Sequence, residues 1–268
     1  MKRLGVLGWP VAHSRSPAMH RAALAATGLE GEYAYQRLPC PPEVFDETVR
    51  ALAGAGFVGA NVTIPHKEAA LAVATDASSA AQAIGAANTL TFAGAEIRAD
   101  NTDAPGLLSA IGTPPATAFV LGAGGSARAA VYALRGAGSD VAVWNRTPER
   151  ARRVAEDLGA RAVSDPIGAE LLVNCTPVGL HDGDATFKEL PLRAEELGEY
   201  ACVVDLVYRD VGTELLHEAQ RRGCRVVDGL EVLVAQGAAS FEIWTGASAP
   251  VDVMRRAAHG DVPSRQPS

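Results

Sequence analysis

Residues 119–127 read FVLGAGGSA, and this stretch decides the fold of the second half of the chain. An apolar strand runs into a glycine turn that opens a helix, in the pattern G-x-G-x-x-(G/A). The first glycine permits the tight turn, the second lets the backbone approach a pyrophosphate, and the small third residue allows the helix to pack closely on the strand. The helix N-terminus supplies N–H donors to phosphate oxygens. The stretch therefore predicts a dinucleotide site formed by Gly122, Ala123, Gly124, Gly125, Ser126 and Ala127.

The end of the following strand indicates which dinucleotide is bound. Residues 141–144 (VAVW) lead into Asn145, Arg146 and Thr147, and Arg150 follows one helical turn later. A site for NAD usually carries Asp or Glu here, which holds the ribose 2′-hydroxyl. Guanidinium groups without a carboxylate suit a 2′-phosphate instead, because they form charge-assisted pairs with it. We therefore expect NADP(H) as the cofactor, with Asn145, Arg146, Thr147 and Arg150 at its 2′-phosphate end.

Strand-like and helix-like segments alternate along almost the whole chain, which is the α/β pattern. Before residue 103 the apolar segments 4–9, 33–38 and 57–64 read as strands, and a hairpin follows over residues 88–99. A turn-rich stretch at residues 112–116 (GTPPA) separates them from a cleaner βαβ series. We expect two α/β domains joined near residues 103–116, an N-terminal substrate domain and a C-terminal Rossmann domain.

The composition excludes several classes of protein. The chain has 268 residues, of which 48% are hydrophobic and 21% charged, so it is long enough for two domains and is not disordered. The net charge is −7 and no basic stripe is present, which argues against nucleic acid as a partner. No apolar run reaches the ~20 residues that span a bilayer, and residues 1–4 lead straight into a strand rather than a signal peptide, so no membrane partner is expected.

The cysteines argue against two further kinds of site. Cys40, Cys175, Cys202 and Cys224 are scattered, without a Cys-x-x-Cys pair. This spacing favours neither a disulfide framework nor a thiolate metal site, and it is typical of small buried side chains in a reducing cytoplasm. We therefore expect a cytoplasmic protein without a metal.

Four polar strings stand out in the first half, at residues 8–17, 61–67, 85–90 and 100–106. In the second string Asn61 and Thr63 alternate with apolar residues, so their side chains point to the same side of a strand. Each string alone is explained by turn or capping chemistry. Four of them together indicate a pocket for a small polyhydroxylated ligand.

These strings closely resemble the shikimate dehydrogenase family. The resemblance extends to residues 122–127, 145–147, 174–179 (NCTPVG), 204–208 (VDLVY) and 229–246, and covers residues 4–246 in order and with the family's spacing. It implies a two-domain enzyme that reduces 3-dehydroshikimate to shikimate with NADPH, in the pathway to chorismate and the aromatic amino acids. It also implies that the last helices pack back on the substrate domain. The expected division is 1–103 with 231–260 for the substrate domain, 104–230 for the Rossmann domain, and 261–268 for a flexible tail.

The resemblance also implies roles for individual residues. Lys67 and Asp103 match the family's catalytic pair, which also contacts substrate. Substrate contacts are implied for Ser14, Ser16, Asn61, Thr63, Asn88, Tyr208 and Gln236. Cofactor contacts near the nicotinamide are implied for Thr176, Leu206 and Gly229. The chain departs from the pattern at Val232, where many relatives have Met, and at Asp210, where many have Pro.

The side chains themselves support Lys67 as an acid–base group. Ketone reduction needs a hydride donor, a proton source and a polarised carbonyl. The chain has 21 Arg but only three Lys, and an arginine cannot give up its proton at working pH, whereas a lysine can. Asp103 would hydrogen-bond the reacting hydroxyl and hold Lys67. The sequence leaves open which of the two donates the proton.

Two other functions remain open at this point. One is a sister enzyme of the same fold that acts on quinate or aminoshikimate, or that uses NAD. The other is a catalytically silent NADP(H) sensor, which would have no need for both Lys67 and Asp103. No tyrosine is followed four residues later by lysine, which excludes the short-chain dehydrogenase pair. The sequence does not decide between a monomer and a homodimer.

Overall fold

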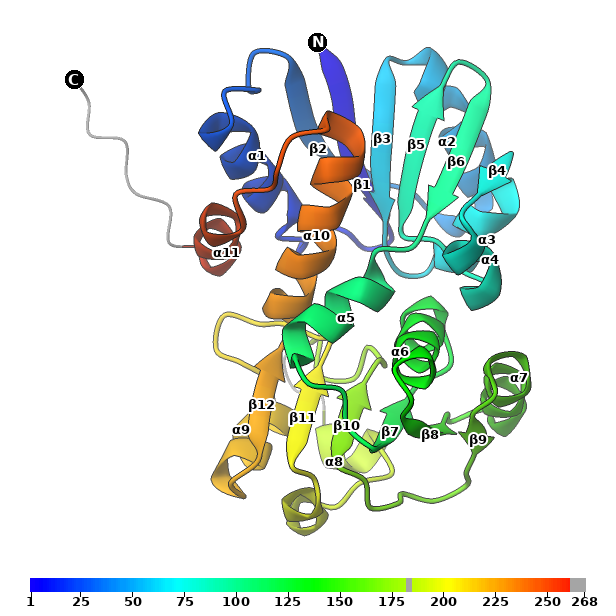
Figure 1. The fold of residues 1–268 in the computed structure, drawn as a ribbon, viewed down its shortest axis with the longest axis vertical. Helices are drawn as coiled ribbons and strands as arrows, with labels where there is room; N and C mark the ends of the chain where they lie inside the picture. The colour runs from blue at the N-terminus through cyan, green and yellow to red at the C-terminus, as the bar shows by residue number, and fades with distance from the viewer. Residues whose placement is uncertain (182–184, 261–268) are drawn as a thin grey trace, which may run out of the picture. The chain divides into compact units, whose positions relative to one another are not determined.

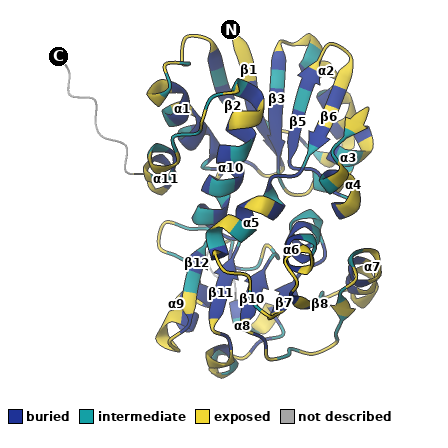
Figure 2. Ribbon diagram, in the orientation of Figure 1, coloured by how far each residue is buried: buried dark blue, intermediate teal, exposed yellow. Residues whose placement is uncertain are grey.

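The computed structural model describes residues 1–181 and 185–260, so the predicted flexible tail 261–268 lies outside the described residues. The chain forms two compact units, each with its own sheet (Figure 1). Unit 1 comprises residues 1–78, 87–102 and the chain from 233 onward. Unit 2 comprises residues 79–86 and 103–232. The central strands of each sheet are buried over most of their length (Figure 2).

Unit 1 holds a mixed six-stranded sheet in the order β2-β1-β3-β5-β6-β4. Strands β2, β1 and β3 are parallel, β5 is antiparallel to both β3 and β6, and β4 is parallel to β6. The strands are β1 (Lys2–Gly8), β2 (Tyr33–Pro39), β3 (Phe57–Val62), β4 (Asp76–Ala77), β5 (Thr89–Ala93) and β6 (Glu96–Asp100). The helices are α1 (Ser16–Ala26), the 3-10 turn η1 (Pro42–Val44), α2 (Phe45–Gly54), α3 (Lys67–Val73) and α11 (Val251–His259).

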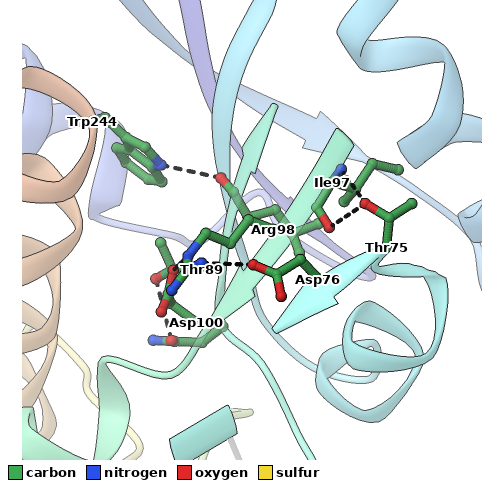
Figure 3. Close-up of polar contacts among 9 residues, drawn as sticks. Thr75, Asp76, Thr89, Ile97, Arg98, Asp100 and Trp244 are labelled. Atoms are coloured by element: carbon green, nitrogen blue, oxygen red, sulfur yellow. Dashed lines mark hydrogen bonds and ion pairs between the residues drawn. The ribbon is translucent and has the colours of Figure 1, made fainter. Parts of the chain in front are cut away.

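Side chains make several of the contacts at the β4 edge of this sheet. The Thr75 hydroxyl donates to the Ile97 carbonyl at 3.2 Å and accepts from the Ile97 N–H at 2.8 Å (Figure 3). Arg98 pairs with Asp76 at 2.6 Å and with Asp100 at 3.5 Å. The two threonine bonds add to the backbone bonds, Thr75 N–H to the Ile97 carbonyl at 2.8 Å and Ser78 N–H to the Ala99 carbonyl at 3.0 Å, that attach the two-residue strand β4 to β6.

Unit 2 holds a wholly parallel sheet in the order β12-β11-β10-β7-β8-β9. This sheet has the doubly wound order of a Rossmann fold, with its switch point between β7 and β10. The strands are β7 (Thr117–Leu121), β8 (Asp140–Trp144), β9 (Arg161–Ala162), β10 (Leu171–Asn174), β11 (Cys202–Asp205) and β12 (Arg225–Asp228). The helices are α4 (Ser79–Ile84), α5 (Asp103–Ile111), α6 (Gly125–Gly136), α7 (Pro148–Leu158), α8 (Thr186–Glu189), η2 (Ala194–Glu199) and α9 (Glu214–Arg221).

The strands of unit 2 are apolar on both sides because helices cover both faces of the sheet. On β7, Ala118 and Val120 face a cluster that includes Leu107 and Leu134 from α5 and α6. Phe119 and Leu121 on the same strand face a second cluster built largely from α9, η2 and the segments beside them. The alternation places successive side chains on opposite faces, as strand geometry requires. The α/β class with a Rossmann sheet is thereby confirmed.

The helix α10 (Gly229–Thr245) begins in unit 2 and continues into unit 1. Within unit 1, Trp244 donates from its indole N–H to the Leu90 carbonyl of β5 at 3.1 Å. Gly59 on β3 makes room for this indole, since a Cβ there would overlap the ring. The last helix, α11, packs against α1. The last helices thus pack on the elements of unit 1, as expected from the sequence.

One segment clusters differently from the expected division. The expected start of the Rossmann domain at residue 104 lies one residue into α5, whose Leu107 and Ile111 are buried in unit 2. Residues 79–86, expected with the substrate domain, cluster with unit 2. Ile84 and Ala86 pack in a buried apolar cluster with residues of α5 and α6, and Arg128 of α6 donates to the Ile84 carbonyl.

Candidate active site

In unit 1 most of the predicted substrate residues lie near one end of the strands of the sheet, where β1, β3 and β6 end and β5 begins. Ser14 lies in the segment that joins β1 to α1, Ser16 is the first residue of α1, and both are almost fully buried. The Ser14 hydroxyl accepts from the Ser16 N–H at 3.3 Å, and the Ser14 carbonyl accepts from Arg37 at 2.9 Å. This turn therefore holds two hydroxyls close together, and a guanidinium group fixes its backbone.

Thr63 and Lys67 follow the end of β3. The Thr63 N–H donates to the Leu7 carbonyl at 2.9 Å, which carries the parallel pairing with β1 one residue past the strand. Gly8 is required beside it, because a Cβ there would come within 2.5 Å of the Thr63 methyl. Lys67 begins α3 and is half-buried, and its carbonyl accepts from the Ala87 N–H at 2.8 Å. That bond places the backbone of Lys67 beside the residue that precedes Asn88.

Asn88 is held by a two-point contact with Thr102. The Asn88 amide oxygen accepts from the Thr102 backbone N–H at 2.7 Å, and its NH₂ group donates to the Thr102 hydroxyl at 2.9 Å. The same NH₂ group donates to the Gln236 amide oxygen at 3.0 Å. Gln236 in turn donates to the Leu233 carbonyl at 2.8 Å. The amides of Asn88 and Gln236 are therefore oriented by the protein itself.

Asn61 is fixed from two sides. Its amide oxygen accepts from the Tyr35 hydroxyl at 2.7 Å, and its NH₂ group donates to the Ser240 hydroxyl at 2.9 Å. Thr89, at the start of β5, lies 3.0 Å from Ser240 through their hydroxyl oxygens. A continuous chain of hydrogen bonds thus connects Asn61, Asn88 and Gln236, three of the residues predicted from the sequence.

Sequence reasoning did not identify the residues that make these connections. They are Tyr35, Thr89, Thr102 and Ser240, all almost fully buried. Thr89 and Thr102 lie inside the polar strings, next to the predicted site residues Asn88 and Asp103, so these two threonines were partly indicated by the sequence. Tyr35 and Ser240 lie in segments that read as an ordinary strand and an ordinary apolar helix. Only the fold brings them to the amides.

In unit 2 the glycine turn has the geometry that a dinucleotide needs. Gly122 has φ +109° and its N–H donates to the Trp144 carbonyl at 2.8 Å. A Cβ on Gly122 would lie 3.2 Å from the Cys175 backbone, so this position is restricted by both φ and space. A Cβ on Gly124 would meet nothing within 4 Å, which leaves open space over the N-terminus of α6. The residues present therefore fit a bound pyrophosphate.

The segment after β8 presents the basic residues predicted for a 2′-phosphate. Asn145 donates from its amide to the Thr147 carbonyl at 3.0 Å, which shapes the turn into α7. Pro148 lies in the first turn of this helix, which ends at Gly159 with φ +68°. Arg146 and Arg150 are exposed at the start of α7, with no carboxylate at position 145. This surface is suited to a phosphate dianion.

A buried carboxylate organises the loops at the carboxyl ends of β10 and β11. Asp205 accepts from the Asn174 amide at 2.9 Å, the Thr213 hydroxyl at 2.7 Å and the Val207 N–H at 3.1 Å. Burial raises the pKa of Asp205 to about 7, although these three hydrogen bonds act in the opposite direction. Asn174 also accepts from the Thr176 hydroxyl at 2.7 Å. The carboxylate thereby anchors the segments that carry two predicted cofactor contacts, Thr176 and Leu206.

Gly229 and Leu206 are in close contact. A Cβ on Gly229 would lie 2.6 Å from the Leu206 carbonyl oxygen and 2.8 Å from that of Asp205. Only a glycine lets the start of α10 approach this backbone. The close approach gives a physical reason for glycine at this predicted cofactor position.

The predicted site residues are divided between the two units. Ser14, Ser16, Asn61, Thr63, Lys67, Asn88 and Gln236 belong to unit 1. Asp103, the first residue of α5, and Tyr208, in the segment after β11, belong to unit 2. Both are half-buried. Asp103 directly follows Thr102 in the chain, so its backbone is next to the residue that bonds Asn88.

Within residues 1–181 and 185–260, no group of three or more His, Cys, Asp or Glu side chains is placed to hold a metal ion. None of the helices in these two ranges is long and apolar enough to cross a membrane.

Comparison with known proteins connects both units to one family. Residues 6–90 match the model of the shikimate dehydrogenase substrate binding domain, and residues 229–259 match that of the shikimate 5′-dehydrogenase C-terminal domain. The shikimate dehydrogenase (NADP(+)) of one strain of Thermus thermophilus is 49% identical over 258 residues, which covers 92% of this chain and 93% of that protein. The enzyme of the same name from Methanopyrus kandleri is 43% identical over 276 residues, covering 95% and 93%.

A solved structure agrees with these sequence matches. The crystal structure of shikimate 5-dehydrogenase from a second strain of Thermus thermophilus, in complex with NADP(H) and shikimate, superposes with a TM-score of 0.87 at 45% identity. The superposition covers 98% of this chain and 100% of that one.

Proposed function

The chain belongs to the shikimate dehydrogenase family, and we propose that it catalyses the reversible, NADPH-dependent reduction of 3-dehydroshikimate to shikimate. One observation of the structure carries this proposal beyond family membership. The amides of Asn61, Asn88 and Gln236, which come from three distant parts of the sequence, are joined by a single buried hydrogen-bond network. Such an oriented set of amides suits a ring that bears several hydroxyls.

The polar residues of unit 1 divide between the two ends of this substrate. Ser14 and Ser16, with Thr63 nearby at the same sheet edge, offer hydroxyls to the carboxylate. Asn61, Asn88 and Gln236 offer oriented amides to the ring hydroxyls. Tyr208 of unit 2 completes the predicted set. Because most of these groups are buried and bonded within the protein, little side-chain freedom remains to be lost when substrate binds.

Lys67 and Asp103 are the residues that handle the proton. Reduction of the ketone adds a hydride to carbon and a proton to oxygen, and NADPH supplies the hydride when bound. The Lys67 ammonium group binds the carbonyl oxygen, polarises it and, with Asp103, provides the proton for the new hydroxyl. In the reverse direction the pair removes that proton.

Unit 2 holds the cofactor. The turn from Gly122 to Ala127 and the N-terminus of α6 bind the pyrophosphate, and Asn145 to Thr147 with Arg150 bind the 2′-phosphate. Thr176, Leu206 and Gly229 face the nicotinamide half. The open space over Gly124 and the absence of a carboxylate at Asn145 support this assignment.

We also propose that the enzyme works in the cytoplasm, as a monomer or a homodimer. The scattered cysteines support a reducing compartment, because all four are free thiols in the structure and three of them are buried. Gel filtration with light scattering determines the oligomeric state directly.

The test of the function is absorbance at 340 nm with shikimate or quinate, each with NADP⁺ or NAD⁺. The expected result is rapid reduction of NADP⁺ with shikimate and much slower reduction in the other three combinations. A preference for quinate or NAD⁺ would assign a sister activity on the same fold. Silence in all four combinations, with tight NADPH binding, would contradict the proposal and favour a sensor.

The catalytic role of Lys67 predicts a clear separation of binding from turnover. Lys67→Ala is expected to lower turnover by two or more orders of magnitude, the scale of a lost acid–base group, while NADPH binding measured by fluorescence stays near normal. The control is Lys188→Ala, which removes an exposed lysine on α8 and is expected to change neither quantity. Unchanged turnover in Lys67→Ala would exclude the role.

A further inference from the structure

The hydroxyl of Ser240 occupies the centre of the polar network in unit 1. Ser240 lies on α10, one turn after Gln236, and its side chain is fully buried. Its oxygen is 2.9 Å from the Asn61 amide nitrogen, 3.0 Å from the Thr89 hydroxyl and 3.2 Å from the Thr102 hydroxyl. It also lies 3.0 Å from the Gln236 carbonyl oxygen. These partners come from β3, from the start of β5, from the segment after β6 and from α10 itself.

The chemistry of these four partners restricts where the protons lie. A hydroxyl donates one hydrogen and accepts at most two. The Asn61 NH₂ group can only donate, so Ser240 must accept from it. The Gln236 carbonyl can only accept, so it takes the Ser240 proton unless a threonine oxygen does. One further lone pair of Ser240 accepts from either Thr89 or Thr102.

The two threonine hydroxyls connect Ser240 to Asn88. Both lie 3.2 Å from the Asn88 amide oxygen, which already accepts the Thr102 backbone N–H. They also lie 3.2 Å from each other, and Thr102 lies 3.4 Å from the Gln236 amide oxygen. Ser240 therefore contacts both amides: it accepts directly from Asn61, and it bonds the threonines that lie against the Asn88 amide oxygen.

The Ser240 hydroxyl could meet its own need for hydrogen bonds with fewer partners than it has. A hydroxyl inside a helix commonly bonds the carbonyl four residues earlier. Thr245 on the same helix bonds the Phe241 carbonyl in this way at 2.8 Å and accepts the Ala247 N–H at 3.2 Å. Ser240 has that carbonyl at 3.0 Å and three further polar partners within 3.2 Å, which compete for one proton and two lone pairs. An alanine at this position would leave the Asn61 NH₂ group without its closest acceptor, at a buried position.

We propose that Ser240 is a positioning residue for substrate binding, which sets the orientation of the Asn61 and Asn88 amides through their shared network. The proposal rests on the proposed function, in which these amides contact the substrate ring. Ser240 itself acts only through them. It follows that Ser240 affects the binding of shikimate and leaves the binding of NADP⁺ in unit 2 unchanged.

The experiment compares Ser240→Ala and Ser240→Cys with the wild type in steady-state assays of shikimate oxidation. Ser240→Ala is expected to raise KM for shikimate about tenfold while KM for NADP⁺ stays within about twofold, the effect of losing one buried hydrogen bond to an amide. Ser240→Cys keeps a weak donor and acceptor and is expected to give an intermediate KM for shikimate. The matched control is Ser139→Ala, which removes an equally buried hydroxyl that donates to the Pro115 carbonyl in unit 2. It is expected to leave KM for shikimate unchanged.

Several results would overturn the proposal. One is an unchanged KM for shikimate in Ser240→Ala. Another is a parallel rise of both KM values, which would indicate a general loss of structure. Isothermal titration of shikimate into each protein without cofactor distinguishes this proposal from the proposed function. If the wild type binds shikimate but does not oxidise it, the proposed function is wrong. An unchanged Kd for shikimate in Ser240→Ala would overturn the role of Ser240 whether or not the wild type oxidises shikimate.

Discussion

The buried imidazole of His20 predicts a specific dependence of stability on pH. His20 lies on α1, and its ring stacks on Tyr35 with centroids 4.3 Å apart and planes within 4°. Phe241 and Trp244 complete the surroundings, at centroid distances of 6.4 and 5.8 Å. Neither ring nitrogen has a hydrogen-bond partner within the described part of the chain. Burial lowers the pKa of His20 to about 3, against a smaller opposite effect of the Asn61 amide, so the folded protein keeps this ring neutral.

The sign and size of the effect follow from linkage. Below about pH 6.5, the ordinary histidine pKa, the unfolded chain binds a proton that the folded chain does not, so stability falls as the pH falls from 7. At pH 5 the folded ring is still neutral, and the size of the loss depends only on the unfolded pKa. Between pH 7 and pH 5 the loss attributable to His20 is about 2 kcal/mol. The loss continues as the pH approaches 3 and ends below the folded pKa.

The perturbation is His20→Phe, which keeps an aromatic ring against Tyr35 and removes the titrating group. Its larger ring adds a packing cost that does not depend on pH. The readout is therefore the change in the free energy of unfolding between pH 7 and pH 5, measured by urea titration, rather than stability at one pH. This change is expected to be about 2 kcal/mol smaller in His20→Phe than in the wild type. Asp205, whose raised pKa makes stability fall as the pH rises from about 4 to 7, is present in both proteins and cancels.

The control makes the same substitution at an exposed histidine. His259→Phe, at the end of α11, is expected to change the pH dependence by no more than a few tenths of a kcal/mol. If His20→Phe and the wild type lose equal stability between pH 7 and pH 5, the folded imidazole is protonated at pH 5. The account of His20 as a ring that stays neutral when buried would then be refuted.

Two further predictions concern unit 2. Replacing both Arg146 and Arg150 by Ala is expected to raise KM for NADP⁺ by about ten- to a hundredfold and to leave KM for NAD⁺ nearly unchanged, because the two arginines bind only the 2′-phosphate. The control is Arg153→Ala on the same helix, and an equal rise in KM for both cofactors would exclude a role of Arg146 and Arg150 in binding the 2′-phosphate. Gly229→Ala is expected to destabilise the protein by about 1–3 kcal/mol and to raise KM for NADP⁺, because its Cβ would press on the Leu206 carbonyl. Gly136→Ala, where a Cβ meets nothing within 4 Å, is the control for urea midpoints, and an equal midpoint shift in the two variants would contradict this reasoning.

The elements that could be predicted are those whose signal is local. The glycine turn after β7 and the arginines that open α7 combine a strand, a turn and a helix within a few residues, and the structure places these elements close to where the sequence puts them. The helix α5 was only partly foreseen, because Pro105 and the polar string before it resemble a linker. Its apolar spacing at Leu107 and Ile111 was the available signal.

The buried network around Ser240 could not be predicted in the same way. Tyr35 and Ser240 lie far from each other and from Asn88 in the sequence, and no local pattern marks either of them as a partner of Asn61. A serine in an apolar helix and a tyrosine in an apolar strand both read as ordinary core positions. The hydrogen-bond partners of Asp205 could not be predicted either, because its three donors come from β10 and from the segments after β11.

The sequence by itself determined the α/β class, the Rossmann half with its preference for a 2′-phosphate, and the family to which the chain belongs. Those properties depend on short strings, in which neighbours along the chain are also neighbours in space. Only the tertiary structure decided that residues 79–86 pack with unit 2, that the amides of Asn61, Asn88 and Gln236 share one network, and that the ring of His20, within the described part of the chain, is buried without a partner. Those properties depend on which distant segments the sheets bring together, and burial turns each such contact into a constraint on orientation or charge.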